Sequence, residues 1–201
     1  MNSLGGKIYV LGLSASPRPG SNSDILLDKA LEGAGSCRGG ARTEKVSLCR
    51  IEFSPCRECA DMPGDGRCTV KDGLQGVYDK INRAGIIILS SPIFFGSLSA
   101  QAKMMVDRMQ CLWRAQYILH RDVWKGKRKI GGLICVQASQ RQDFFQNARS
   151  IARNFFAAVN TEYKGGIFCP GLEEKGAVLR HSDFLRKAKE LGERLCLRPT
   201  T

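Results

Sequence analysis

KIYVLGLSASPRPGSNS, residues 7–23, is the stretch of sequence that decides the fold. It opens with an apolar run at residues 8–11, which is typical of a buried parallel strand. A loop rich in Ser, Gly and Pro follows, and helix-forming residues begin near Ser23. Because the first amides of a helix have no internal partner and carry the positive end of the helix dipole, this order predicts an anion site. The alternative interpretation is an ordinary N-cap and turn.

The loop in this stretch offers the groups that bind a phosphate monoester. Ser14, Ser16, Ser21 and Ser23 can donate hydrogen bonds from their hydroxyls, and Arg18 adds a fixed positive charge. The stretch contains neither G-x-x-x-x-G-K-[ST] nor G-x-G-x-x-G. These absences disfavour a nucleoside triphosphatase and a Rossmann dinucleotide site, and they favour the flavodoxin-like form of the doubly wound fold.

The charge balance narrows the class of partner. The 31 Lys and Arg residues exceed the 19 Asp and Glu residues, which gives a formal net charge of +12. A basic chain suits nucleic acid, an acidic protein or an anionic small molecule. The positive charges are scattered and are not interleaved with aromatic residues, so we expect no nucleic-acid partner.

Length and cysteine content indicate the number of domains and the cellular compartment. The 201 residues fit one domain, which we expect to span residues 1–201. No apolar run approaches the roughly 18 residues of a membrane helix, and no signal peptide is recognisable, so we expect no membrane association. Nine cysteines without a secretion signal predict a reducing, cytoplasmic location.

The remaining chain alternates strands and helices. This alternation predicts an α/β fold with a doubly wound, five-stranded parallel sheet in the order 2-1-3-4-5. The site is then expected in the loops after strands one, three and four. Expected strands are residues 8–11, 41–49, 85–91, 128–136 and 162–168; expected helices are 24–33, 72–83, 99–113, 144–159 and 184–195, with a loop region at 117–126.

The loop after the third strand, residues 91–97, reads SPIFFGS. Proline fixes the backbone and leaves neighbouring amides and carbonyls free to form hydrogen bonds with the edge of a ligand. Phe94 and Phe95 offer flat apolar surface for a ring system. The alternative is that both are buried aromatic residues at a strand end.

Four stretches together resemble one family. They are GLSASPRPGSNS (12–23), SSPIFFGSLSAQAKMMVDR (90–108), KGKRKIGGLICV (125–136) and the tail LEEKGAVLRHSDFLRKAKELGERL (172–195). In this order they resemble the NADPH-dependent FMN reductase family of flavodoxin-like proteins. The segment 51–70, which we call the Cys-rich insert, resembles the iron–sulfur flavoprotein branch of that family.

The resemblance implies an FMN-dependent oxidoreductase, with NAD(P)H as co-substrate and a small-molecule electron acceptor or donor. It implies a homodimer or homotetramer, and no catalytic residue, because the flavin carries the chemistry. It assigns the FMN phosphate to Ser14, Ser16, Arg18, Ser21, Asn22 and Ser23, and the flavin ring to Pro92, Ile93, Phe94, Phe95, Gly96, Ala138 and Ser139. The alternative is a flavodoxin-like electron-transfer protein that accepts electrons from ferredoxin without nicotinamide turnover.

The Cys-rich insert carries three of the four cysteines of the branch. Cys56, Cys59 and Cys68 match its spacing, and Met62 stands at the remaining position. A thioether is a poor replacement for the thiolates of an iron–sulfur cluster, so we expect no four-cysteine cluster and no metal. Cys49 could supply a fourth thiolate, but it is expected within the second strand. The alternative is a cluster that relays electrons between ferredoxin and FMN.

Residues 111–119, CLWRAQYIL, follow the helix after the third strand. Trp, Tyr and Arg are enriched in interface cores, so this segment predicts a homo-oligomer contact. The alternative is the end of an ordinary core helix. In the same region, Lys103 and Asp107 are four residues apart on a helix and are expected to form a structural ion pair.

Overall fold

The computed structural model describes residues 7–37, 40–59, 62–125 and 128–197. Five parallel strands form a sheet in the order β2-β1-β3-β5-β6, and the two-residue β4 pairs antiparallel with the end of β3. The strands are β1 (Ile8–Ser14), β2 (Ala41–Ser47), β3 (Ile86–Phe94), β4 (Ser97–Leu98), β5 (Lys129–Val136) and β6 (Thr161–Cys169). The predicted order 2-1-3-4-5 is confirmed, with β5 and β6 as its fourth and fifth strands.

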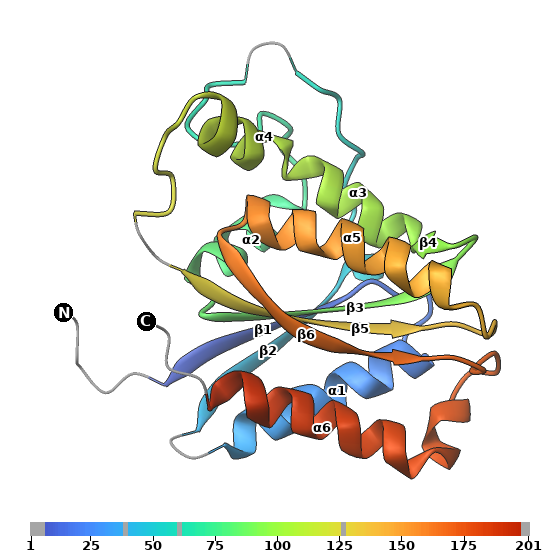
Figure 1. Ribbon diagram of the computed structural model, residues 1–201. Coiled ribbons are helices and arrows are strands. Elements are labelled where there is room, and N and C mark those ends of the chain that lie inside the picture. Colours follow the sequence, from blue (N-terminus) through green and yellow to red (C-terminus); the bar gives the residue numbers. More distant parts are fainter. Residues whose placement is uncertain (1–6, 38–39, 60–61, 126–127, 198–201) are drawn as a thin grey trace.

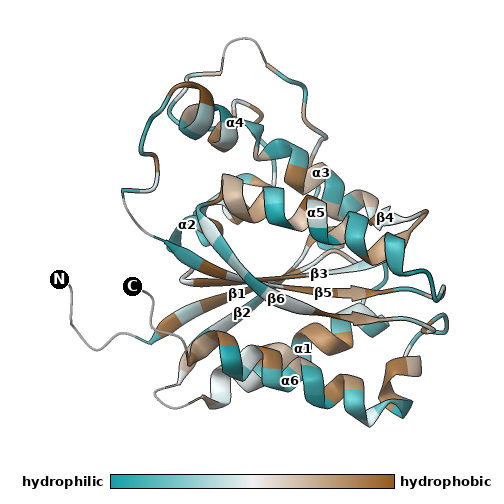
Figure 2. Ribbon diagram, in the orientation of Figure 1, coloured by the Kyte–Doolittle hydropathy of each residue, from teal (hydrophilic) through white to brown (hydrophobic). Residues whose placement is uncertain are grey.

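Helices cover both faces of the sheet (Figure 1). One face packs against α2 (Gln75–Arg83), α3 (Ala100–Arg108) and α5 (Gln142–Ala158). The other face packs against α1 (Asn22–Ser36) and α6 (Ser182–Cys196). The central strands β3 and β5 are therefore apolar along nearly their whole length, as Figure 2 shows.

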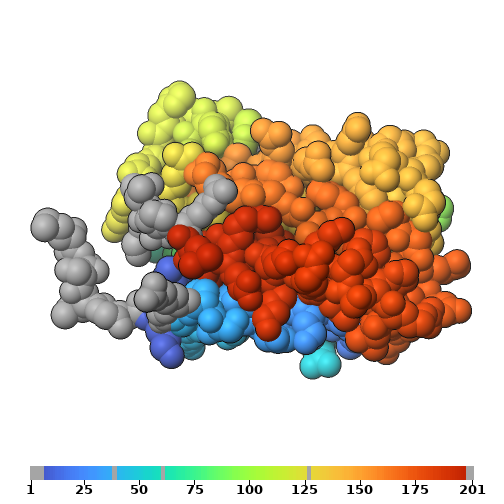
Figure 3. All heavy atoms as spheres, turned by 60° about the horizontal axis from the view of Figure 1, so that its bottom comes forward, coloured from blue at the N-terminus to red at the C-terminus, as the bar shows by residue number. Residues whose placement is uncertain are grey.

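The helices α1 and α6 lie side by side and cover the second face (Figure 3). Glycine makes their close approach possible. A Cβ atom added at Gly192 of α6 would lie 1.8 Å from the carbonyl oxygen of Ala30 in α1. One added at Gly33 of α1 would lie 2.1 Å from the carbonyl oxygen of Lys189. Any larger side chain at these two positions would force the helices apart.

Four sequence expectations need correction. The loop expected over residues 91–97 is shorter, because β3 continues to Phe94. The second strand ends at Ser47, and Cys49 lies in the 3-10 turn Leu48–Arg50 rather than in the strand. The helix expected over residues 99–113 divides at Met109 into α3 and α4 (Gln110–Trp113). The helix is interrupted just after Arg108, whose backbone carbonyl oxygen accepts a hydrogen bond from the Tyr78 hydroxyl. Part of the expected loop 117–126 belongs to the π-helical turn Arg114–Ile118, which continues α4.

The Cys-rich insert leaves β2 through the turn Leu48–Arg50 and returns to α2. It runs beside α4 at one end of the molecule, away from the sheet (Figure 1). Along the described parts of the chain, no helix combines the length and apolarity needed to cross a membrane.

Candidate functional site

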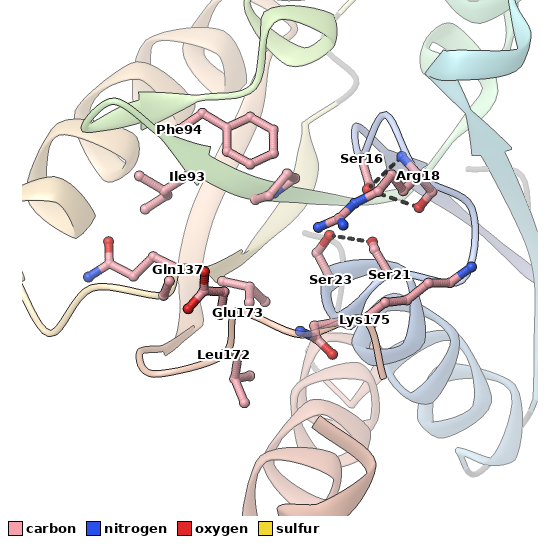
Figure 4. Close-up of a pocket in the computed structure, with 14 residues that line it drawn as sticks. Ser16, Arg18, Ser21, Ser23, Ile93, Phe94, Gln137, Leu172, Glu173 and Lys175 are labelled. Carbon is pink, nitrogen blue, oxygen red and sulfur yellow. Dashed lines mark hydrogen bonds between the residues drawn. The ribbon is translucent and has the colours of Figure 1, made fainter. Parts of the chain in front are cut away.

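A cavity opens at the carboxyl edge of the sheet, where the loops after β1, β5 and β6 meet the end of β3 (Figure 4). This is the switch point at which ligands bind in doubly wound sheets. Its lining residues come from the ends of β3 and β5, the start of α1 and the loops after β1, β5 and β6: Ser16, Arg18, Ser21, Asn22, Ser23, Pro92, Ile93, Phe94, Val136, Gln137, Ala138, Leu172, Glu173 and Lys175.

One end of the cavity is the N-terminus of α1. Ser21 is the N-cap, and its hydroxyl accepts a hydrogen bond from the Asp24 amide at 3.4 Å. The Ser21 and Ser23 hydroxyls lie 3.2 Å apart. Arg18 extends its guanidinium into the cavity above them (Figure 4). The helix dipole, the hydroxyls and the guanidinium all favour negative charge, so this end of the cavity favours the binding of an anion.

The loop that presents these groups is held by its own hydrogen bonds. The Ser16 hydroxyl accepts from the Arg18 amide at 3.1 Å and donates to the Arg18 carbonyl oxygen at 3.0 Å. The Ser90 hydroxyl of β3 donates to the Ser23 carbonyl oxygen at 2.7 Å. These contacts fix the loop before any ligand arrives, which lowers the entropy cost of binding.

Two residues assigned to the phosphate by resemblance have other partners. Ser14 is buried outside the cavity and hydrogen-bonds to the Asp24 carboxylate. Asn22 lines the cavity, but its amide nitrogen donates to the Glu174 carbonyl oxygen at 2.8 Å. Its amide oxygen accepts from the Val178 amide at 3.1 Å. Asn22 therefore ties the loop after β6 to α1.

Asp24 anchors the same loop as an ionised carboxylate. Its oxygen Oδ2 accepts from the Gly20 amide at 2.8 Å, and the Lys45 ammonium lies 3.3 Å from Oδ1. Burial acts to raise the pKa of Asp24, but hydrogen bonds from Gly20 and Ser14 and the charge of Lys45 outweigh it. The net pKa lies below the ordinary value of 3.8.

The opposite end of the cavity is apolar. Pro92, Ile93, Phe94 and Leu172 are among the lining residues, and Figure 4 shows Leu172 across the cavity from Ile93 and Phe94. Phe94 is 42% exposed and Phe95 is fully exposed, so the alternative of two buried aromatic residues is wrong. Phe95 and Gly96, both at positive φ, form the turn between β3 and β4 and do not line the cavity.

The loop after β5 contributes Gln137 and Ala138, whereas Ser139 lies outside the lining. Gln137 is 4% exposed, and its amide nitrogen donates to the carbonyl oxygens of Ser139 at 2.9 Å and Arg141 at 2.7 Å. Its oxygen Oε1 is buried without a hydrogen-bond partner in the described structure.

Sequence reasoning missed Gln137 and the contribution of the loop after β6. Leu172, Glu173 and Lys175 come from that loop, which was not counted among the switch-point loops. The tail that begins at Leu172 was the available signal, because it is one of the four stretches that carry the family resemblance.

The Cys-rich insert is tied to α3 through Arg108. The Arg108 guanidinium donates to the carbonyl oxygens of Ser54 at 2.9 Å and Val70 at 3.2 Å. Its Nε donates to the sulfur of Cys68 at 3.2 Å. Asp72 completes the cluster with a charge pair to the same guanidinium.

The insert itself supplies three thiolates, so a four-thiolate cluster would also need Cys49, which lies in the turn Leu48–Arg50 just before the insert. Cys56, Cys59 and Cys68 are joined by Met62, whose side chain packs against the hydrophobic core. Among the described residues, no group of three or more His, Cys, Asp or Glu side chains is arranged to hold a metal ion. The expected ion pair between Lys103 and Asp107 is confirmed at 2.8 Å.

Solved structures share the fold. A flavone reductase superposes with a TM-score of 0.68 at 17% identity, covering 94% of this chain and 62% of that chain. An NAD(P)H:quinone oxidoreductase from Methanothermobacter marburgensis superposes with a TM-score of 0.66 at 16% identity, covering 96% of this chain and 100% of that chain. At such identities the likeness shows the flavodoxin-like fold alone.

Sequence comparison shows more than the fold. An iron–sulfur flavoprotein of Methanocaldococcus jannaschii is 36% identical over 131 residues, which cover 65% of this chain and 63% of the relative. One from Methanosarcina thermophila is 30% identical over 65% of this chain and 64% of the relative. The matched region thus spans less than two thirds of these relatives. The sequence profile described as NADPH-dependent FMN reductase matches residues 8–163, so the chain belongs to the NADPH-dependent FMN reductase family.

Proposed function

We propose that this protein is an FMN-dependent oxidoreductase that uses NAD(P)H, acts on a small-molecule electron acceptor or donor, and forms one FMN-binding domain over residues 1–201. One observation carries the proposal. The cavity at the switch point joins an anion end, at the N-terminus of α1, to an apolar end walled by Ile93 and Phe94. FMN has the matching shape, with a phosphate at one end and a flat ring at the other.

The lining residues fit the two ends of FMN. Ser21, Ser23 and Arg18 would hold the phosphate, Ser16 would hold their loop in place, and Lys175 would add a second positive charge. Pro92, Ile93, Phe94 and Ala138 would lie along the ring. When bound, FMN supplies the redox chemistry, and these residues position it and exclude water. We assign no catalytic residue to the chain.

An absorption spectrum tests the proposal. The purified protein, incubated with FMN and freed of excess ligand, should retain one FMN per chain and show the flavin bands near 450 nm. Acid release followed by chromatography should give FMN rather than FAD, because the site offers one anion end. Oxidation of NAD(P)H with a quinone or free flavin as acceptor should then proceed in steady state. A protein that stays colourless would overturn the proposal.

The second candidate is an electron carrier that accepts electrons from ferredoxin. The net charge of +12 favours it, because a basic surface attracts an acidic protein. The two functions differ in turnover. A carrier would be reduced stoichiometrically by ferredoxin and would show no steady oxidation of NAD(P)H, whereas the enzyme would turn over with the nicotinamide.

The same proposal includes a homodimer or homotetramer in the cytoplasm. Apolar side chains are exposed together on α4 and the turn that follows it: Trp113, Tyr117, Ile118 and Leu119. Trp113 and Tyr117 pack with ring centroids 6.1 Å apart, which makes one continuous aromatic surface. Light scattering at micromolar concentration should give a multiple of 22.1 kDa. A monomer mass would contradict this part of the proposal.

A further inference from the structure

Two cysteines lie at the ends of the helices α1 and α6, which cover one face of the sheet. Both helices begin at the cavity edge of the sheet, run in the same direction and end side by side at the opposite edge (Figure 1). Cys37 is the C-cap of α1, and Cys196 is the last residue of α6. Both are free thiols with partly exposed side chains, and neither lines the cavity. The proposed function therefore makes no use of them.

The two helices touch backbone to backbone one turn before the cysteines. A Cβ atom added at Gly33 would lie 2.1 Å from the backbone of α6, and one added at Gly192 would lie 1.8 Å from the backbone of α1. Cys37 follows Gly33 by four residues, and Cys196 follows Gly192 by four residues. Residues four apart lie on the same face of a helix, one turn further on. The spacing therefore places both cysteines at the continuation of this contact.

The sulfur of Cys196 lies against the last turn of α1. Its Sγ donates to the carbonyl oxygen of Ala34 at 3.5 Å. Carbonyl groups in the last turn of a helix point along the axis toward the C-terminal end, which is where Cys37 is attached. Burial, followed by a hydrogen bond and a charge interaction with Cys37, raises the pKa of the Cys196 thiol to about 12. The two thiols are therefore direct neighbours across the helix contact.

We propose that Cys37 and Cys196 form an intrachain disulfide that locks α1 against α6 when the surroundings turn oxidising. In a reducing compartment the pair stays as two thiols, because such compartments keep cysteines reduced. The cysteines lie near the two ends of the chain, so the bond closes most of the chain into one loop and restricts the unfolded state strongly. The lock lies at the edge of the sheet opposite the cavity, so it leaves the cavity open.

The oxidant is a small-molecule disulfide. One protein thiolate attacks a sulfur of this oxidant, which breaks the S–S bond of the oxidant, releases one oxidant thiolate and leaves a mixed disulfide. The other protein thiolate attacks the protein sulfur of the mixed disulfide, which forms the bond between Cys37 and Cys196 and releases the second oxidant thiolate. Two electrons pass from the cysteines to the oxidant. The two protons lost by the protein thiols are taken up by the two released thiolates.

Peptide mapping tests whether the bond forms. The full chain is equilibrated with mixtures of reduced and oxidised glutathione, blocked with N-ethylmaleimide and digested with trypsin without reduction. Cleavage after Lys29, Arg38 and Arg194 should release residues 30–38 joined to residues 195–201. Dithiothreitol should separate the joined peptides. On a non-reducing gel the oxidised protein should keep the mass of one chain, 22.1 kDa.

Two variants show that the joined peptide reports this pair. Cys37→Ser should abolish it, and Cys196→Ser takes the place of Cys37→Ser if that variant does not fold. Cys49→Ser is the matched control, because it removes another partly exposed cysteine, in the turn Leu48–Arg50. The control should give the joined peptide at the wild-type level.

Urea unfolding tests whether the bond locks the helices. The oxidised wild type should unfold at a higher urea concentration than the reduced wild type, because the bond restricts the unfolded chain. Cys49→Ser should show the same shift between the oxidised and reduced forms. Cys37→Ser should lose the shift. A disulfide between Cys56 and Cys59 would be distinguished here, because its effect would persist in Cys37→Ser.

Three results would overturn the proposal. The first is that both peptides carry only N-ethylmaleimide or a single glutathione after oxidation. The second is a bond between two chains, seen as a doubled mass on the non-reducing gel. The third is a joined peptide without any shift in the urea midpoint, which would show that the bond locks nothing. None of these measurements requires FMN, so each result leaves the proposed function as it is.

Discussion

The guanidinium of Arg108 and the carboxylate of Asp72 form a charge pair, with Nη1 and Oδ2 2.7 Å apart and the arginine side chain fully buried. A second contact, from Nη2 to Oδ1 at 3.3 Å, makes the pair bidentate. It joins α3 to the chain just beyond the Cys-rich insert. Arg108 also binds Ser54, Cys68 and Val70, so one side chain holds both ends of the insert.

Removing this arginine should destabilise the fold. Arg108→Met leaves the Asp72 carboxylate without its charge partner and removes the donor to the carbonyl oxygens of Ser54 and Val70. We expect it to lower the free energy of unfolding by about 3 kcal/mol. Lys103→Met is the control, because it breaks an exposed pair on the same helix. That control should cost less than about 1 kcal/mol. Urea denaturation measures both; equal losses in the two variants would contradict the role given to Arg108.

Asp72 should make the free energy of unfolding depend on pH in the acidic range. Burial acts to raise its pKa, but hydrogen bonds from Arg108 and from the Ser54 and Leu74 amides bring it below the ordinary 3.8. A lowered folded-state pKa stabilises the fold fully above that ordinary value, and the gain is lost as pH falls through the folded-state pKa. The advantage of the wild type over Asp72→Asn in urea midpoint should therefore shrink from pH 6 to pH 3. An advantage that is constant across this range would refute the linkage.

Replacing two helical glycines with alanine should change the stability of the protein in opposite directions. Gly192→Ala forces a methyl group against the Ala30 carbonyl oxygen and should destabilise the protein by about 2 kcal/mol. At Gly76 of α2 an added Cβ meets nothing within 4 Å. Gly76→Ala should therefore stabilise the protein by about 0.5–1 kcal/mol, because alanine is the better helix former. Thermal unfolding of the two variants measures the contrast, and a loss of stability in both would count against it.

Arg18 should recognise the phosphate and not the ring. We expect Arg18→Gln to weaken FMN about tenfold, the usual scale for loss of one charge-assisted hydrogen bond. Riboflavin lacks the phosphate, so its affinity should not change. Arg186→Gln, on the exposed face of α6, is the charge-matched control. Fluorescence titration supplies all of these constants; an equal loss for FMN and riboflavin would show that Arg18 does not contact the phosphate.

The insert should hold no four-cysteine cluster. Met62 replaces one thiolate, and Cys68 is engaged by Arg108. Protein purified without oxygen should therefore contain less than about one iron atom per chain and little acid-labile sulfide. Cys56→Ala should leave that value unchanged. About four iron atoms per chain, lost in Cys56→Ala, would prove the expectation wrong.

Much of the architecture follows from local sequence. The uninterrupted β-branched run within residues 85–91 predicted the strand that became β3, because a strand covered on both faces is apolar along its length. Residues 128–136, which are apolar after Arg128 and Lys129, predicted the strand that became β5. Alternation with helices then left few topologies, and the strand order followed. The first loop and the third-strand loop could be recognised because their Ser, Arg, Pro and Phe residues lie close together in the chain.

Tertiary structure alone decided which side chains meet. Ser14 and Ser16 read alike in the sequence, yet Ser14 pairs with Asp24 and Ser16 lines the cavity. The neighbours of Arg108 in the sequence give no sign of its contacts, yet its side chain is buried and binds residues 36 to 54 positions away. Local patterns record which faces of an element are buried, but partners distant in the chain are chosen by packing, which no local pattern encodes.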